Sequence, residues 1–306
     1  MISVVVCTHN RGEMLLRTLD DLSRLSAGPT GLEILVVDNG STDDTRDRVA
    51  TRSRAGPHPL RYIREDRLGQ SHARNRGIRE AAGDWILFTD DDVMVDPAWA
   101  VRLPAELELL GVRAGGGRVV PVWPESLPPW VATEGPLLER IAFVEYALPG
   151  GPRLLGDDDP SPVGCNMAIH RSLVAAGDPF SVRLGHRGHR LLGGEDTEFF
   201  ARLRSAGVGL GYVPDALISH PVEPERLALT YLLRRRYWEG YGSAASGALA
   251  GRRRLFGVPL VIPTDLLRCV GAGARGALVG DWPAAAHGLG GAFNRLGCLH
   301  GLLPRR

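Results

Sequence analysis

Apolar and polar residues follow two rhythms in the first hundred residues of the chain. The segments Ile2–Thr8, Leu32–Val37 and Trp85–Thr89 are almost continuously apolar, and the first two are rich in β-branched residues. Such runs are typical of strands that are buried on both faces of a sheet. Between residues 13 and 25, leucines instead recur at the spacing of a helix. This alternation predicts a mostly parallel sheet that is covered by helices.

The alternation continues to residue 110. Leu60–Arg64 is predicted as a short strand, and Pro97–Leu109 as a helix. Residues 70–82 are predicted as another helix, because Gly69 precedes them and Gly83 follows them, and glycine is common just beyond helix ends. Strands and helices therefore follow one another with short connections throughout this part of the chain.

The pattern changes after Gly111. The stretch "AGGGRVVPVWPESLPPW" is rich in glycine and proline, so it predicts an irregular loop with one strand around Arg118–Val122. Val208–Val213 and Ala216–Ser219 are predicted as two short strands. From Pro224 onward the apolar spacing is helical.

The loop after the second strand, "DNGSTDDT", carries the signal of a helix start. Ser41 or Thr42 is predicted to cap a helix whose first turn holds Asp43 and Asp44. Serine and threonine are favoured at helix caps, and acidic residues are favoured in the first turn.

The chain divides near residue 220 in charge as well as in pattern. We predict one α/β domain over residues 1–220 and a helical region over residues 221–306. All 36 basic residues are arginine, and the net charge is +1. Residues 1–220 hold 24 arginines and 30 acidic residues, a net charge of −6, whereas residues 221–306 hold 12 arginines and 5 acidic residues, a net charge of +7.

Arginine triplets lie beside aromatic residues in the helical region, in "LLRRRYWEGYG" and "GRRRLFGVP". Three uses of this region stay open. Packing within the protein ranks first, formation of a homodimer second, and contact with an anionic membrane surface third.

Composition excludes several classes of protein. A hydrophobic fraction of 44% and a charged fraction of 23% are ordinary for a globular protein and argue against disorder. The four cysteines are far apart and form no Cys-x-x-Cys pair, which disfavours a cysteine zinc site or a disulfide scaffold. The start "MISVVVCTHNR" lacks the features of a signal peptide, and no window has the roughly 18 apolar residues of a membrane span. A cytoplasmic location is therefore expected, with peripheral contact at the inner face of a membrane as the further option.

Polar residues follow three of the predicted strands at the point where each strand ends. The first strand ends with Thr8 and is followed by His9, Asn10 and Arg11, the second is followed by Asp38, Asn39 and Gly40, and the strand "WILFT" is followed by the run Asp90–Asp92. Ligands of open α/β sheets bind beyond the carboxyl ends of the strands. We therefore expect these side chains to lie at one edge of the sheet.

The run Asp90–Asp92 brings together three carboxylates that repel one another. Asp90 and Asp92 are expected to share a face while Asp91 points away. Two carboxylates on one face attract Mg²⁺, whose other ligands are waters and phosphate oxygens. An acidic run alone would favour a solvated turn, but its place after a buried strand favours a site for a cation and a diphosphate.

At this point the sequence resembles a known family. The motifs "SVVVCTHNR", "ILVVDNGSTDDT", "GQSHARNRGIREAAGDWILFTDDDV", "GCNMAIHRSLV" and "GGEDTEFFARLRSAG" occur in the order seen in family 2 glycosyltransferases with the GT-A fold. The resemblance covers about residues 2–220. It implies a nucleotide-sugar-binding half over residues 1–110 and an acceptor-binding half over residues 111–220. It also implies transfer of a sugar to an acceptor hydroxyl, usually with inversion and with Mg²⁺ or Mn²⁺.

The resemblance also implies roles for residues of the first half. Thr8 and Asn10 would lie near the nucleotide, and Asp38 would meet its base or ribose. Arg74 would lie along the nucleotide and diphosphate, where an arginine fork suits phosphate oxygens. Asp90 and Asp92 match the Asp-x-Asp element; Asp92 would bind the metal, and Asp90 would lie near ribose and metal.

Residues of the second half complete the expected site. Inversion requires a base for the proton of the acceptor hydroxyl, and the motif "GGEDTEFF" points to Asp196 with Glu195 beside it. Acidic residues are, however, favoured in any first helical turn by the helix dipole. His220 matches a histidine that completes the metal shell in many relatives, although a lone histidine is more often a packed or surface residue.

The expected partners follow from the same resemblance. The donor is a nucleotide-sugar, with a UDP-sugar preferred and GDP- or dTDP-sugars as alternatives. The acceptor is a saccharide, a lipid-linked saccharide or a natural-product core, and no nucleic acid is expected. The segment His186–Arg190 is predicted to be a mobile loop over the acceptor side with a hinge at Gly188. Trp123 and Trp130 are predicted to form a small hydrophobic cluster, with stacking on a sugar or acceptor as the alternative.

The sequence disfavours three other functions. A non-catalytic sugar-nucleotide binder of the same fold is disfavoured by the intact carboxylates. A nucleotidyltransferase usually has a glycine-rich first loop and a phosphate-binding lysine, and "CTHNRG" has no Gly-x-Gly while the chain has no lysine. The absence of Gly-x-Gly-x-x-Gly after the first strand also disfavours a dinucleotide-binding oxidoreductase.

Overall fold

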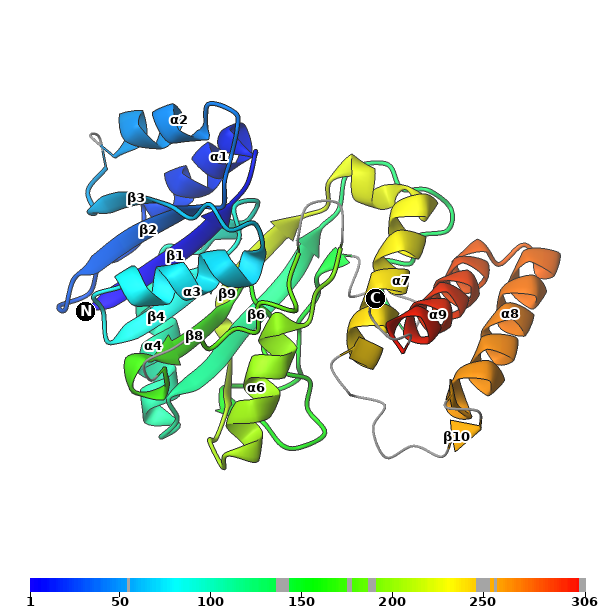
Figure 1. Ribbon diagram of the computed structural model, residues 1–306. Helices are drawn as coiled ribbons and strands as arrows, with labels where there is room; N and C mark the ends of the chain where they lie inside the picture. The colour runs from blue at the N-terminus through cyan, green and yellow to red at the C-terminus, as the bar shows by residue number, and fades with distance from the viewer. Residues whose placement is uncertain are drawn as a thin grey trace. The chain divides into compact units, whose positions relative to one another are not determined.

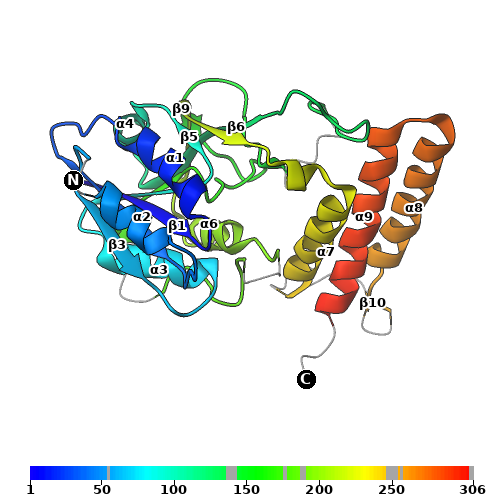
Figure 2. The same cartoon turned by 90° about the horizontal axis from the view of Figure 1, so that it is seen from above.

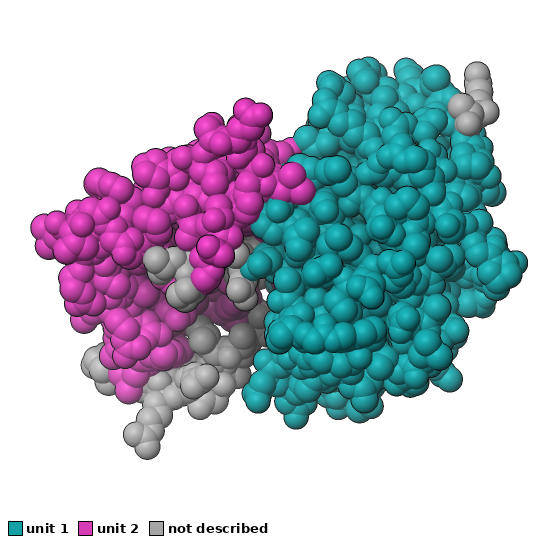
Figure 3. Space-filling model, turned by 180° about the vertical axis from the view of Figure 1, so that it is seen from behind, with its two compact units in different colours: residues 1–121, 145–185, 195–221 teal, residues 122–144, 186–194, 222–306 magenta. Residues whose placement is uncertain are grey.

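The computed structural model forms two compact units (Figure 3). It describes residues 1–53, 56–135, 143–174, 178–186, 191–245, 254–255 and 258–302. Unit 1 comprises Met1–Pro121, Glu145–Gly185 and Glu195–Pro221. Unit 2 comprises Val122–Val144, His186–Gly194 and Val222–Arg306.

Unit 1 is built on one mixed sheet (Figure 1). Among the described residues its strands follow the order β3-β2-β1-β4-β8-β6-β9-β5, and β7 pairs with β9. The strands are β1 (Ile2–Thr8), β2 (Leu32–Asp38), β3 (Leu60–Arg64), β4 (Trp85–Thr89), β5 (Met94–Val95), β6 (Ala114–Val122), β7 (Arg153–Leu154), β8 (Met167–His170) and β9 (Gly211–Pro221).

Parallel pairing is found among the first four strands of this order. β1 pairs in parallel with β2 and β4, and β2 with β3. Thr8 lies opposite Asp38, and Val6 opposite Thr89. The residues that follow β1, β2 and β4 therefore emerge at one edge of the sheet. β8 runs antiparallel to β4 and β6, and β5 and β7 run antiparallel to β9.

Helices cover both faces of the sheet, as Figures 1 and 2 show from two directions. Apolar side chains of α1 (Gly12–Leu22), α2 (Thr45–Arg52) and α4 (Trp99–Leu109) contribute to one hydrophobic core. Those of α3 (Gln70–Glu80) and α6 (Glu195–Ser205) contribute to a second core, which also holds Val5 and Phe88 of the sheet. The short 3₁₀ helix η1 (Arg171–Leu173) follows β8. The predicted α/β class with a mixed sheet flanked by helices is confirmed.

The predicted start of α2 was wrong. The helix begins at Thr45 with Asp44 before it, and neither Ser41 nor Thr42 caps it. Asp43 accepts hydrogen bonds from the backbone N–H and the hydroxyl of Thr45, at 3.1 and 2.5 Å. This local side-chain turn competes with helix formation at Asp43 and delays the first turn.

The glycine-rich stretch after Gly111 was also predicted wrongly. It forms the first half of β6, because a neighbouring strand approaches too closely for any side chain. A Cβ atom on Gly115 would lie 2.3 Å from the carbonyl oxygen of Gly211, and one on Gly117 would lie 2.0 Å from that of Ala216. Gly211 and Ala216 belong to β9, which is one continuous strand and not the two short strands that were predicted.

Substitution of Gly117 by alanine is expected to destabilise the fold strongly. The new methyl group would displace backbone of β9, and overpacking of this kind costs about 3 kcal/mol. Urea unfolding of the variant measures the change. Gly151→Ala is the matched control, since nothing lies within 4 Å of its added Cβ, and its effect should stay within about 0.5 kcal/mol. Equal stability of the two variants would contradict the close approach of β6 and β9.

Unit 2 is mainly helical. Its described elements are η2 (Pro224–Leu227), α7 (Leu229–Ala245), β10 (Arg254–Leu255), β11 (Val258–Pro259), α8 (Val261–Val279) and α9 (Trp282–Gly301). Trp123 and Trp130 pack on Phe143 with ring centroids 5.0 and 6.2 Å apart, as the predicted small cluster requires. In the described part of the chain, no helix has the length and apolarity needed to cross a bilayer. The helical C-terminal region is confirmed, while the domain boundary at residue 220 stays a prediction.

Candidate active site

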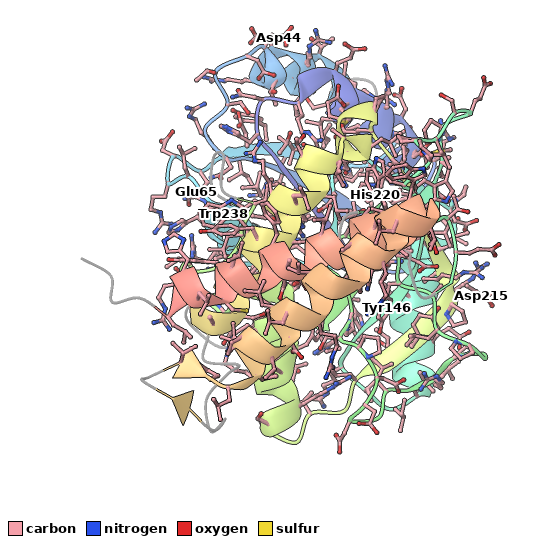
Figure 4. All side chains as sticks on the ribbon, turned by 90° about the vertical axis from the view of Figure 1, so that its right-hand side faces the viewer. Asp44, Glu65, Tyr146, Asp215, His220 and Trp238 are labelled. Carbon is pink, nitrogen blue, oxygen red and sulfur yellow. The ribbon has the colours of Figure 1, made fainter. Side chains whose placement is uncertain are left out.

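Three candidate metal ligands meet in unit 1. Asp90 and Asp92 follow β4 directly, and His220, labelled in Figure 4, is the penultimate residue of β9. One ligand atom from each residue lies within 4.8 Å of the other two. The pairing of Met94 in β5 with Ser219 in β9 explains this approach, since it joins the segment after Asp92 to the residue before His220.

The orientation of the His220 ring suits metal binding. Its Nδ1 lies 3.1 Å from the carbonyl oxygen of Pro221, and a hydrogen bond there requires the proton on Nδ1. In the neutral ring Nε2 is then an acceptor, and it lies 3.3 Å from a carboxylate oxygen of Asp92. Two electron-rich atoms that face each other in a buried position are stabilised by a cation between them. The set of two carboxylates and one imidazole fits Mg²⁺ or Mn²⁺.

Asp91 has partners of its own outside this group. It accepts hydrogen bonds from the hydroxyl of Thr8 at 2.6 Å and from Arg11 at 2.9 Å. The same guanidinium nitrogen of Arg11 lies 2.9 Å from Asp92. Burial raises the pKa of the Asp91 carboxyl and the charge of Asp92 adds to the rise, whereas Arg11 and Thr8 oppose it. Arg11 therefore holds two of the three adjacent carboxylates together.

A buried ion pair connects α3 to α6. The guanidinium of Arg74 donates a hydrogen bond to Glu195, and it lies 3.9 Å from Asp90. Burial alone would lower the pKa of Arg74, but Glu195, Asp196 and Asp90 raise it above its ordinary value. A Cβ atom on Gly164 would lie 2.2 Å from the guanidinium, so only glycine leaves room for it there. Arg74 thus carries a fixed positive charge between the two acidic motifs.

Asp196 lies in the first turn of α6 and is half-buried. One of its oxygens accepts a hydrogen bond from the backbone N–H of Gly164 at 2.7 Å, and the other accepts one from the N–H of Thr197 at 2.7 Å. These two bonds fix the direction of the carboxylate. A carboxylate has about four acceptor sites, so capacity remains for a substrate hydroxyl.

The candidate nucleotide-binding residues lie at the ends of β1 and β2. Asn10 has a positive φ of 53°, and its side-chain oxygen accepts a hydrogen bond from the N–H of Thr42 at 2.7 Å. Asp38 is buried, and it accepts hydrogen bonds from the N–H of Ser41 at 2.8 Å and the hydroxyl of Tyr62 at 2.5 Å. Both residues order the loop after β2. Contacts of Thr8, Asn10 and Asp38 with a nucleotide stay predictions.

Burial favours the protonated thiol at both cysteines near the site. Burial raises the pKa of the Cys7 thiol to about 12, with Asp90, Asp91 and Glu195 adding to the rise and Arg74 opposing it. Burial also raises the pKa of Cys165 well above its usual range. Cys165 lies within the electrostatic reach of Asp90, Asp92 and Asp196. Arg74, which pairs with Glu195 and lies 3.9 Å from Asp90, shows that the two acidic motifs are close to one another.

Sequence reasoning placed Arg11 at the ligand edge of the sheet without a specific partner, and it assigned no role to Gly164. Arg11 follows Asn10 directly, which was a usable signal, because the loop after β1 was already expected at the site. Gly164 offered no comparable signal, since its role depends on the approach of Arg74. The predicted hinge at Gly188 lies outside the described residues.

Comparison with known proteins agrees with this geometry. The sequence model described as glycosyl transferase family 2 matches residues 3–176, more than half of the chain. The chain belongs to glycosyl transferase family 2. A member of this family moves a sugar from a nucleotide-sugar donor, and this chain is therefore a glycosyltransferase.

This family 2 glycosyltransferase has relatives over most of its length. It is 27% identical over 276 residues to the succinoglycan biosynthesis protein ExoM of Rhizobium meliloti, covering 85% of this chain and 80% of that protein. It is 24% identical over 247 residues to the glucosyl-dolichyl phosphate glucuronosyltransferase of Haloferax volcanii, covering 78% of this chain and 75% of that protein.

A solved structure confirms the GT-A fold of the family 2 enzyme. The mannosyltransferase PcManGT of Pyrobaculum calidifontis, in complex with GDP-Man and Mn²⁺, superimposes with a TM-score of 0.56 at 20% sequence identity. The likeness covers 95% of this chain and 85% of that one.

Proposed function

We propose that this enzyme is an inverting, metal-dependent glycosyltransferase that acts on an acceptor hydroxyl. The observation that carries the proposal is the meeting of Asp90, Asp92 and His220 at one point, with ligand atoms within 4.8 Å of one another. A divalent cation held there would stabilise, as a Lewis acid, the negative charge that develops on the diphosphate leaving group. Mg²⁺ and Mn²⁺ are the proposed ions.

The chain's own groups would prepare this site before a donor binds. Arg11 bridges Asp91 and Asp92, which reduces the repulsion between adjacent carboxylates. Arg74 would face the donor's diphosphate from its place beside Asp90, and its fixed charge suits phosphate oxygens. Thr8, Asn10 and Asp38 would contact the nucleoside.

Asp196 is the proposed general base. Its carboxylate is held by the N–H groups of Gly164 and Thr197 and would take the proton of the acceptor hydroxyl. Glu195 would act through Arg74, because the two side chains form a buried ion pair. Glu195 is therefore proposed as a positioning residue.

The donor and acceptor are proposed as classes. A UDP-sugar is the first candidate for the donor, and the GDP-Man bound in the related mannosyltransferase supports testing GDP-sugars beside dTDP-sugars. A saccharide or lipid-linked saccharide is the proposed acceptor. The similarity to a protein of succinoglycan biosynthesis and to an enzyme named for a glucosyl-dolichyl phosphate supports both options. A cytoplasmic location is proposed with this function.

A thermal-shift screen with UDP-, GDP- and dTDP-sugars tests the proposal. The matching donor with Mn²⁺ should raise stability by about 3 kcal/mol at a hundredfold excess over its dissociation constant. Release of nucleoside diphosphate should then follow in the presence of an acceptor, and the anomeric configuration of the product reports inversion. A retained anomeric configuration, or equal turnover with a chelator present, would contradict the proposal. Donor binding without turnover on a broad acceptor panel would favour the non-catalytic alternative.

A further inference from the structure

The helices of unit 2 touch through glycine. A Cβ atom on Gly288 of α9 would lie 2.3 Å from the backbone nitrogen of Gly273 in α8. On the other side of α9, a Cβ atom on Gly297 would lie 1.8 Å from the carbonyl oxygen of Tyr237 in α7. Backbone therefore packs against backbone at both interfaces, and these contacts leave no room for large apolar side chains.

The large apolar side chains of α8 and α9 point outward instead. Of the fifteen large apolar side chains that are exposed among the described residues, eight lie between Leu260 and Leu296. Leu267 and Leu278 of α8 are 75% and 84% exposed. Figure 4 turns both helices towards the viewer and shows side chains projecting from them. A soluble helix pair ordinarily buries such residues in its own interface.

Helical spacing joins these residues into one surface. On α8, Leu267, Val270, Ala274 and Leu278 recur every three or four residues; on α9, Trp282, Leu289 and Leu296 recur every seven. Gly273 of α8 and Gly288 of α9 face each other and fix how the two antiparallel helices are turned. Because a helix turns about 100° per residue, Val270 of α8 and Leu289 of α9 then lie on the same side of the pair. We call this surface the apolar face; its large residues are Leu267, Val270, Leu278, Trp282, Leu289 and Leu296.

Positive charge accompanies the apolar face. Arg268 and Arg275 are exposed, and at about 100° per residue they lie roughly 60–100° around α8 from Leu267 and Leu278, on the side away from Val270. Asp265 lies 3.1 Å from Arg295 and 3.8 Å from Arg268, and Asp281 caps α9 by accepting a hydrogen bond from Ala284. The sequence from Pro221 to Arg306 carries a net charge of +7.

Charge favours one of the two candidate occupants of the apolar face. A symmetric dimer, in which this face meets the same face of a second copy, would bring a region of charge +7 against another of charge +7. A bilayer that contains anionic phospholipid instead attracts each nearby arginine by about 1 kcal/mol. Arginine side chains at the edge of an apolar helix face also reach the headgroups while the apolar residues enter the acyl boundary.

We infer that the apolar face of α8 and α9 binds the surface of an anionic membrane, with both helices lying in the plane of the interface. Leu267, Leu278 and Trp282 enter the headgroup–acyl boundary, and Arg268 and Arg275 contact the lipid phosphates. This raises membrane contact from third to first among the uses considered for the region. The inference goes beyond the proposed function, because vesicle binding needs neither donor nor turnover.

Co-sedimentation of the full chain with vesicles tests the inference. We expect the protein to bind vesicles of phosphatidylcholine mixed with phosphatidylglycerol, and not those of phosphatidylcholine alone. Added salt should weaken binding, since it screens the arginines. The double substitution Leu267→Ser and Leu278→Ser should lower the vesicle affinity by about tenfold or more. Arg268→Gln with Arg275→Gln should lower it about thirtyfold on anionic vesicles.

The matched control is Leu109→Ser at the end of α4 in unit 1, where the leucine is 81% exposed. This variant should bind vesicles like the unmodified chain, and melting temperatures should be equal for all variants because every altered side chain is exposed. Absence of binding to anionic vesicles would overturn the inference. So would unchanged binding of the Leu267→Ser, Leu278→Ser variant. Light scattering tests the other occupant, a second copy of the chain. If the unmodified protein is a dimer that this variant converts to monomers, with vesicle binding unchanged, the apolar face is a dimer interface and the inference is wrong.

Discussion

Replacement of Asp92 by asparagine should slow sugar transfer by about a thousandfold, equal to about 4 kcal/mol of transition-state stabilisation. The asparagine keeps the volume of the buried side chain but removes the charge that faces His220 at 3.3 Å. The variant should therefore fold, yet bind Mn²⁺ much more weakly. Release of nucleoside diphosphate measures the first effect, and Mn²⁺ titration by calorimetry measures the second.

Asp157→Asn provides the control for Asp92→Asn. Asp157 begins the second acidic run of the chain, "DDDP", but it is exposed and lies outside the group formed by Asp90, Asp92 and His220. Its substitution should change neither turnover nor Mn²⁺ affinity. If Asp92→Asn transferred sugar at the unmodified rate, the metal part of the proposed function would be wrong, whatever the activity of other variants.

Replacement of Asp196 by asparagine should lower kcat by about a thousandfold, the loss expected when a general base is removed. Donor binding and Mn²⁺ affinity should stay the same, because the side chain is held by Gly164 and Thr197 and not by the metal ligands. A lowered kcat with unchanged Mn²⁺ affinity distinguishes the Asp196 variant from the Asp92 variant, which should lose both. Single-turnover kinetics with saturating donor measures the rate, and calorimetry measures binding.

A neighbouring acidic residue tests the simpler explanation that Asp196 only complements the dipole of α6. Glu198 lies in the same first turn of α6 and pairs with Arg202 at 2.6 Å. If acids are present there only to complement the helix dipole, Glu198→Gln and Asp196→Asn should have equal and small effects, below about 1 kcal/mol on stability. A catalytic base predicts instead that only Asp196→Asn loses turnover.

Much of unit 1 could be predicted because its strands are buried on both faces. The run Ile2–Thr8 matches β1 residue for residue, and Leu32–Val37 differs from β2 only by Asp38. The first half of β6 could not be predicted, since glycine disfavours strands by itself. Only the contact of Gly115 and Gly117 with β9, which lies about a hundred residues further along the chain, makes glycine necessary there.

Only part of the candidate site could be predicted from the sequence. The approach of the residues that follow β1, β2 and β4 was predictable, because parallel strands end at one edge of a sheet. The partners of individual side chains were not. Arg11 meets Asp91 and Asp92 across some 80 residues, and Arg74 meets Glu195 across 121. Local pattern holds no information about such pairs, which depend on how α3 and α6 pack on the sheet.

The short pairing between β5 and β9 has a consequence for how the site responds to heat. Only two residue pairs, Met94 with Ser219 and Val95 with Ile218, join these strands, and β5 ends the strand order of the sheet. Local opening of so short a contact costs far less than global unfolding. Such an opening would separate Asp92 from His220 and disturb the first core only where Val95 and Ile218 pack, while the second core stays intact. Cation affinity at the proposed site would then depend on this local opening, and activity should fall on warming before the enzyme melts.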